Sequence, residues 1–190
     1  MEYNKTNLII IIVLIAFLVV GSYFVIKIRR EQNQDLYSNI FSCHEQRVPF
    51  RVNISACNGI PVSPDEGTLT NTLTSPFVNG VVILVDPGET GGTGVSAFEI
   101  YKIYNSLQNY TGKRVGIAYT KPWPNQTNIP VMSIDNATFQ NPIILLRRNQ
   151  SITQIRVDGP AIYVDAISQQ DLDSASCKIS ILTIKKVLNC

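Results

Sequence analysis

The residues from Leu8 to Ile26 form a run of nineteen residues without a charged side chain. A helix of about 20 residues crosses the hydrocarbon core of a bilayer, which is roughly 30 Å thick, so the run predicts a transmembrane helix. A cleaved signal peptide usually has an apolar core of only about 7–15 residues, which favours an uncleaved anchor. Membrane lipid in contact with this run is therefore the first partner that the sequence predicts.

The rest of the chain is large enough for one globular domain. Apolar side chains between residues 36 and 41 recur at helical spacing, which favours a helical stalk, with a disordered tether as the alternative. The three predicted parts are an anchor with short flanks at residues 1–30, a juxtamembrane helical stalk at 31–42 and a disulfide-linked, β-rich domain at 43–190.

The side of the membrane on which the domain lies is contested by two signals. Lys27, Arg29 and Arg30 follow the run, and the positive-inside rule then favours a cytoplasmic domain. Against this stand six Asn-x-Ser/Thr sequons, where random placement gives about two. The five that follow the run are predicted glycosylation sites: Asn53, Asn109, Asn125, Asn136 and Asn149.

Charge and cysteine usage favour an outside domain. Charged residues make up 16% of the chain, against about 25% in an average soluble protein. The four cysteines all follow the apolar run, and none lies in a Cys-x-x-Cys spacing that would suggest a metal site. We therefore expect a single-pass glycoprotein whose domain is extracellular or on a virion or lumenal surface.

The pattern of apolar residues predicts an α+β fold that is mainly β, with a sandwich-like domain and one principal helix. Val81 to Val85 is a continuous apolar run of the kind found in a central strand. Residues 95–110 have helical periodicity and residues 114–120 return to strand character, which predicts a strand, helix, strand unit. Further strands are predicted at residues 143–147, 151–157, 161–166 and 178–187.

Two other segments complete this prediction. Arg47 to Ala56 alternates between apolar and polar side chains, which predicts a half-buried strand. Residues 58–79 are rich in Pro, Ser, Thr and Gly and are predicted to be a surface loop. Asp158 and Gly159 separate two strand-like segments and predict a β-hairpin.

The cysteine positions suggest a crossed disulfide pattern. Cys43 and Cys57 bracket one predicted strand, and Cys177 and Cys190 bracket another. Extended strands of this length hold their ends much farther apart than the roughly 7 Å between Cα atoms that a disulfide tolerates. Antiparallel pairing of the two strands would instead join Cys43 to Cys190 and Cys57 to Cys177, which is the predicted connectivity.

Catalytic chemistry has only a weak candidate. The glycine-rich stretch from Gly88 to Gly94 fits neither the nucleotide P-loop nor the dinucleotide-binding spacing. Ser96 lies near a nucleophile-elbow pattern whose last glycine is missing, and Asp86 and Glu89 are the carboxylates that could assist it. We expect a protein that is not an enzyme, with a membrane-tethered hydrolase or ligand-binding protein using the Asp86 to Ser96 loop as the alternative.

Other partners are limited by composition. A net charge of +2 without a basic stripe argues against nucleic-acid binding, and one histidine argues against His-rich metal sites, so we expect no metal and no cofactor. Trp123 stands between two prolines and could contact a protein partner or the domain's own core. The favoured function is a structural or interaction subunit that assembles with other proteins. An accessory subunit of a membrane complex and a viral envelope protein are further alternatives.

Overall fold

The centre of the fold is the predicted strand, helix, strand unit. The computed structural model describes residues 42–43, 46–47, 54–87, 97–123, 128–148 and 150–190. Strand β4 (Gly80–Val85) leads into helix α4 (Ala97–Thr111), and β5 (Arg114–Tyr119) returns parallel to β4 as its direct neighbour. The sequence prediction for this unit is confirmed to within a few residues at each end.

Four more strands extend the sheet on the other side of β4. They are β6 (Ile143–Arg147), β8 (Ala161–Asp165), β7 (Gln154–Asp158) and the short β3 (Val62–Ser63), in the order β3-β7-β8-β6-β4-β5. Strands β4, β5, β6 and β8 are parallel, whereas β7 runs antiparallel to β8. The β7–β8 hairpin turns at Gly159, whose φ of +57° is a conformation that glycine adopts without strain. The predicted hairpin is therefore present.

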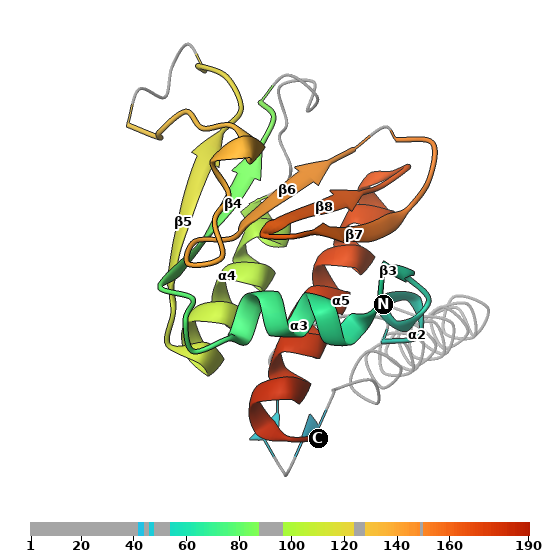
Figure 1. Ribbon diagram of the computed structural model, residues 1–190. Coiled ribbons are helices and arrows are strands. Elements are labelled where there is room, and N and C mark those ends of the chain that lie inside the picture. Colours follow the sequence, from blue (N-terminus) through green and yellow to red (C-terminus); the bar gives the residue numbers. More distant parts are fainter. Residues whose placement is uncertain (1–41, 44–45, 48–53, 88–96, 124–127, 149) are drawn as a thin grey trace, which may run out of the picture.

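Three helices cover one face of this sheet (Figure 1). They are α3 (Glu66–Thr74), α4 and α5 (Gln169–Leu188), and the short α2 (Ile54–Asn58) packs against α5. The alternate strand residues that face them are fully apolar, such as Ile83 on β4, Ile144 on β6 and Ile162 on β8, each 0% exposed. This helical face holds the main core of the domain.

The opposite face of the sheet has only partial cover. Residues 128–141, which include the 3₁₀ turn Ile134–Asn136, connect β5 to β6 and place Met132, Ile134 and Ala137 against Leu84 and Leu145 of the sheet. Figure 1 shows this connection crossing the strands near β4. We call this part of the face, over β4, β5 and β6, the covered half.

Helix α5 corrects a sequence prediction. Residues 178–187 were expected to form a strand because they are rich in Ile and Val, but they lie in the second half of this helix. Every residue from 174 to 184 is buried, so no polar stripe reveals the helical period. The usable signal is the capping box at its start, where the Ser168 side chain accepts from the Asp171 N–H and Asp171 accepts from the Ser168 N–H.

Two predictions near the start of the domain are also wrong in part. Of the strand expected over Arg47 to Ala56, Arg47 lies in β2 (Gln46–Arg47), which pairs with β1 (Ser42–Cys43), and the last residues lie in α2. Residues 48–53 lie outside the described residues. The surface loop expected over 58–79 contains α3, whose amino end is capped by Asp65.

The observed fold is therefore α+β, as predicted, with a mixed six-stranded sheet and four helices among the described residues. The sandwich-like arrangement with one principal helix is wrong, because helices rather than a second large sheet cover the core. No helix in the described part of the chain has the length and apolar character needed to cross a membrane. The predicted anchor from Leu8 to Ile26 and the predicted stalk up to residue 41 lie outside the described residues.

Candidate functional site

The uncovered part of the non-helical face carries a group of large polar side chains. The open half, as we name it, consists of the side chains of β7 and β8 on this face together with Arg147 at the end of β6. Tyr163 on β8 lies at its centre, directly opposite Arg156 on β7. The guanidinium carbon of Arg156 lies 4.2 Å from the centre of the Tyr163 ring, and that of Arg147 lies 5.1 Å from it. Two guanidinium groups thus contact one aromatic ring.

These side chains are held in place by ion pairs of unequal strength. Arg147 donates from Nε and Nη2 to Oδ1 of Asp165 at 2.7 and 2.6 Å, and the Asp165 side chain is only 7% exposed. Arg156 is 3.5 Å from a carboxylate oxygen of Asp158, and both side chains are exposed. Charge-assisted bonds strengthen with burial, so Arg147 is fixed, whereas Arg156 remains accessible to a partner.

Exposed apolar side chains accompany this cluster. Phe139 is 70% exposed and lies close to Gly159, where an added Cβ would be 3.9 Å from its ring. At the other end of the strands, Ile152 and Ile167 are 50% and 54% exposed, and the Ile167 N–H donates to the hydroxyl of Thr153. Arginine, tyrosine and exposed apolar side chains are typical of protein interfaces.

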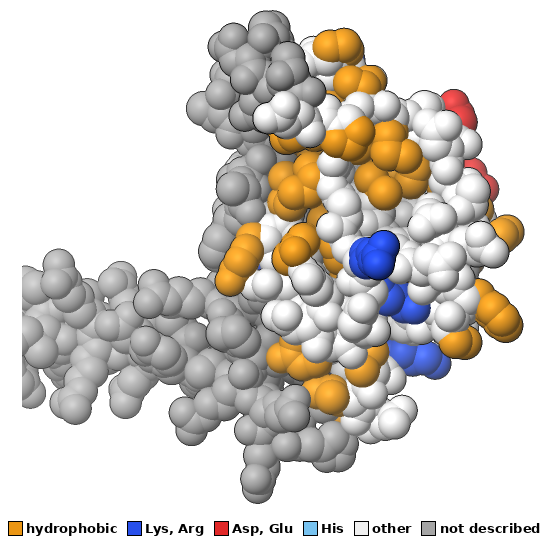
Figure 2. Space-filling model, turned by 90° about the vertical axis from the view of Figure 1, so that its left-hand side faces the viewer, with side chains coloured by type: hydrophobic (Ala, Val, Ile, Leu, Met, Phe, Trp, Pro, Cys, Tyr) orange, Lys and Arg blue, Asp and Glu red, His pale blue; other side chains and the backbone are white. Residues whose placement is uncertain are grey.

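The β5 edge of the sheet carries fewer features of an interaction surface than the open half. Figure 2 shows the side of the molecule that carries this edge, where apolar side chains lie in separate groups and not in one continuous patch. On β5, Arg114 and Gly116 are exposed, and Tyr119 is bridged to Val131 of the following connection. Among the described residues of this side, no ring contact with a guanidinium group like that of Tyr163 is found.

The predicted catalytic loop begins at the carboxyl end of β4. Asp86 follows this strand directly and forms an ion pair of 3.0 Å with Lys121, which follows β5. Because β5 and β6 flank β4 on opposite sides, this end of β4 is a topological switch point, where α/β proteins commonly bind ligands. Glu89 and Ser96 lie outside the described residues, so their predicted roles stay predictions.

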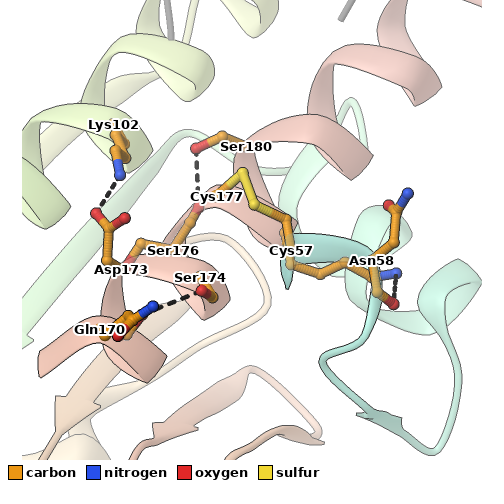
Figure 3. The surroundings of a disulfide bond; sticks show 10 residues. Cys57, Asn58, Lys102, Gln170, Asp173, Ser174, Ser176, Cys177 and Ser180 are labelled. Carbon is orange, nitrogen blue, oxygen red and sulfur yellow. Dashed lines mark hydrogen bonds and ion pairs between the residues drawn. A yellow bond between two sulfur atoms is a disulfide. The ribbon is translucent and has the colours of Figure 1, made fainter. Parts of the chain in front are cut away.

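A buried polar seam joins α4 to α5. Lys102, whose side chain is 1% exposed, forms an ion pair with Asp173, as Figure 3 shows. Nearby on α5, the Ser180 hydroxyl donates to the carbonyl of Ser176. Asp171 and Asp173, the acidic residues of this helix, therefore serve in its cap and in this ion pair. No group of side chains in the described residues is arranged to hold a metal ion.

One predicted disulfide is present at the same interface. Cys57 of α2 is bonded to Cys177 of α5, with their Cα atoms 5.7 Å apart (Figure 3). Cys190 is also disulfide-bonded, and its predicted pairing with Cys43 stays a prediction because the Cys43 side chain lies outside the described part of the chain. The strand pairing from which this disulfide was predicted is wrong, however, because the bond joins two helices and not two antiparallel strands.

The remaining predicted sites, Trp123 and the sequon asparagines, differ in how exposed they are and in whether they are described. Trp123 is half-buried, which leaves both of its predicted roles open. Asn109 on α4 and Asn136 in the 3₁₀ turn have exposed side chains. Asn53, Asn125 and Asn149 lie outside the described residues, and occupancy of all five sequons stays a prediction.

Sequence reasoning missed the open half. The strands that form it were identified, and the hairpin prediction made β7 and β8 neighbours, but the position of β6 with Arg147 beside β8 was unknown. Alternation places Gln154, Arg156 and Asp158 on one face and Ile155 and Val157 on the other, which is the signal that was present. Comparison with known proteins finds no matching family model, no matching curated protein and no matching solved structure.

Proposed function

We propose that this chain is a membrane-anchored surface subunit that binds another protein through the open half of its sheet. The observation that carries the proposal is the contact of two guanidinium groups with the half-buried Tyr163 ring on rigid strands. Arginine and tyrosine contribute strongly to binding when a partner excludes water from them, and strands hold them in place before binding. The protein is thus an interaction module without catalytic activity.

The proposed location combines several features of the sequence and the fold. The run from Leu8 to Ile26 supplies the anchor, and the sequons supply glycans on an outside domain. The Cys57–Cys177 bond supports a domain outside the cytosol, since disulfides persist in oxidising compartments. The exposed positions of Asn109 and Asn136 are compatible with modification.

Assembly can be tested with the full chain in its native membrane. We expect it to migrate in a complex larger than the single chain, and a photo-crosslinking amino acid at Arg156 to capture one defined protein. The same amino acid at Gln108, an exposed residue on α4, is the control and should capture none. Tyr163→Ala should dissociate the complex. A complex that persists unchanged in this variant would contradict the proposal, as would migration as a free chain.

A second candidate is a ligand-binding or hydrolytic site at the carboxyl end of β4. It is favoured by the switch point there and by the Asp86–Lys121 ion pair that links the ends of two strands. A fluorophosphonate probe, which labels activated serines, tests it directly. Labelling that is lost in Ser96→Ala would establish the hydrolase, whereas an unlabelled native chain would remove serine hydrolysis.

A further inference from the structure

We propose that strand β5 pairs with β5 of a second copy of this chain, so that two sheets join across a twofold axis. Strand β5 lies at one end of the strand order and has a neighbouring strand, β4, on one side only (Figure 1). An edge strand presents a row of N–H and C=O groups that another strand can bind. Strands β4 and β6 separate β5 from β8, so this inference is independent of the proposed interaction through the open half.

The backbone groups that point away from β4 belong to alternate residues of β5. Tyr119 accepts from the Met132 N–H and donates to the Pro130 carbonyl, at 2.8 and 2.9 Å, so its groups point outward. Alternation then directs the N–H and C=O groups of Val115 and Ile117 outward as well. No backbone group among the described residues bonds to them on that side. These two residues therefore offer four backbone groups to a partner strand.

Antiparallel pairing of two copies about Gly116 uses all four groups. Val115 of one copy then faces Ile117 of the other, and such a pair exchanges two hydrogen bonds. The symmetric pair on the other side of the axis exchanges two more. Arg114 faces Ala118 of the second copy, so no two charges of β5 are directly opposed, an arrangement that would destabilise the pairing. The edge is thus complementary to itself, as a twofold interface requires.

Gly116 lies on the twofold axis of this pairing. It forms the central non-hydrogen-bonded pair with its own copy, in which the Cα atoms are only about 4.5 Å apart. The fold of one copy does not require glycine here, because its φ is not positive and an added Cβ would meet only Val82, at an ordinary 3.9 Å. Glycine within a strand weakens it and often marks the close approach of another backbone. A second copy accounts for this glycine.

The free length of the edge favours a second copy over a longer peptide. At the carboxyl end of β5, residues 130–132 cover the edge beside Tyr119. In the twofold register, the partner strand reaches this cover at its own Lys113, next to Gly112, where the chain turns toward α4 with a φ of +69°. An unrelated extended peptide would run on into residues 130–132. Lys113 does not guard the edge, because its ammonium group donates to two carbonyls of its own domain, both at 2.8 Å.

Disulfide trapping of the full chain in its native membrane tests the register. Gly116→Cys should give a covalent homodimer on mild oxidation, because a Cα separation of about 4.5 Å lies within the range that a disulfide accepts. Arg114→Cys is the matched control at an exposed position of the same strand. In the proposed register its copy is displaced by about 13 Å along the strand, so it should not cross-link.

A second pair of variants tests the backbone bonds without a new cysteine. Ile117→Pro removes an outward N–H, and proline is tolerated at such positions of an edge strand. By symmetry it removes two of the four hydrogen bonds. We expect the dissociation constant of the dimer, measured by ultracentrifugation of the full chain in detergent micelles, to rise about tenfold or more. Ile117→Ala shortens the same side chain but keeps the N–H, and the dissociation constant should change by less than about threefold.

Several results would overturn the proposal. They are a native chain that stays monomeric, no covalent homodimer in Gly116→Cys, equal cross-linking in Arg114→Cys, cross-linking to a different protein, and equal dissociation constants for the two Ile117 variants. Thermal melting is the folding check, and where one variant fails to fold, the other pair of variants decides. Tyr163→Ala should leave the homodimer intact, which separates this interface from the open half.

Discussion

The two faces of the central sheet are completed in different ways. On the helical face, α3, α4 and α5 bury a continuous apolar core, and the Cys57–Cys177 bond fastens α2 to α5. On the other face, a connection with one 3₁₀ turn covers only part of the strands, and the rest presents Arg156 and Tyr163. One sheet thus separates the residues that stabilise the fold from those available for recognition.

Strand β8 shows this division within five residues. Ile162 and Val164 face the helices and are 0% exposed, whereas Tyr163 between them points to the open half. Because side chains alternate along a strand, an apolar core and a polar surface can share one segment. The comparison predicts that substitutions on the two faces differ in whether they lower stability or binding.

Removal of the Cys57–Cys177 bond should have the largest effect on stability. The bond joins residues 120 positions apart, and the chain-entropy model assigns a loop of this size about 4–5 kcal/mol. We expect Cys57→Ala/Cys177→Ala to lower the free energy of unfolding by about this amount in urea titrations. A loss below about 1 kcal/mol would show that packing alone holds α2 and α5 together.

Neighbouring residues of β6 allow the two faces to be compared on one strand. Ile144, on the helical face, is 0% exposed, and Leu145, on the covered half, is 8% exposed. Ile144→Ala should cost about 3–4 kcal/mol and Leu145→Ala about 2 kcal/mol, because a core under helices relaxes less around a cavity than one under a connection. Chemical denaturation measures both, and a larger loss for Leu145→Ala would reverse our view of the two faces.

Substitution in the open half should barely change stability. Arg156 has a side chain that is 42% exposed, and its contact with Tyr163 is of a kind worth about 0.5–1 kcal/mol at exposed sites. We expect Arg156→Ala to lower the free energy of unfolding by less than about 1 kcal/mol while it disrupts the proposed complex. A loss as large as that of Ile144→Ala would assign the open half to the core.

The smallest predicted effect concerns the amino end of α3. Hydrogen bonds from the hydroxyl and the N–H of Thr68, at 2.7 and 2.8 Å, lower the pKa of Asp65 below its ordinary value of 3.8. A carboxylate with a lowered pKa stabilises the fold above its unfolded-state pKa, and this contribution is lost as pH falls through the folded-state value.

Asp65→Asn provides the matched comparison, since asparagine also caps helices but does not titrate. As pH falls from ~5 to below 3.8, the free energy of unfolding of the native chain should decrease relative to that of this variant. Urea titrations at several pH values measure it. A difference that does not change with pH would show that Asp65 gains no stability from its charge.

Local patterns predicted some elements accurately. Ile143 to Arg147 was assigned to a strand with the bounds that β6 has, and the hairpin at Gly159 was correct. The prediction for the second half of helix α5 was wrong because burial on all sides removes the polar stripe that marks a surface helix. The loop prediction over helix α3 was wrong because residues 66–74 are rich in threonine, which has a low helix propensity. Leu69 and Leu73 were the only apolar residues that marked the buried side of this helix.

The sequence by itself determined the charge-free run from Leu8 to Ile26, the strand, helix, strand unit around β4, and which residues alternate along each strand, because these depend on neighbours in the chain. Only the tertiary structure decided that β6 lies beside β8 and that the connection over residues 128–141 packs against β4 and β6. The contact of Arg147 and Arg156 with Tyr163 depends on that strand order, since it joins three separate strands. Strand order is set by the burial of apolar surface across the whole domain, which no local pattern records.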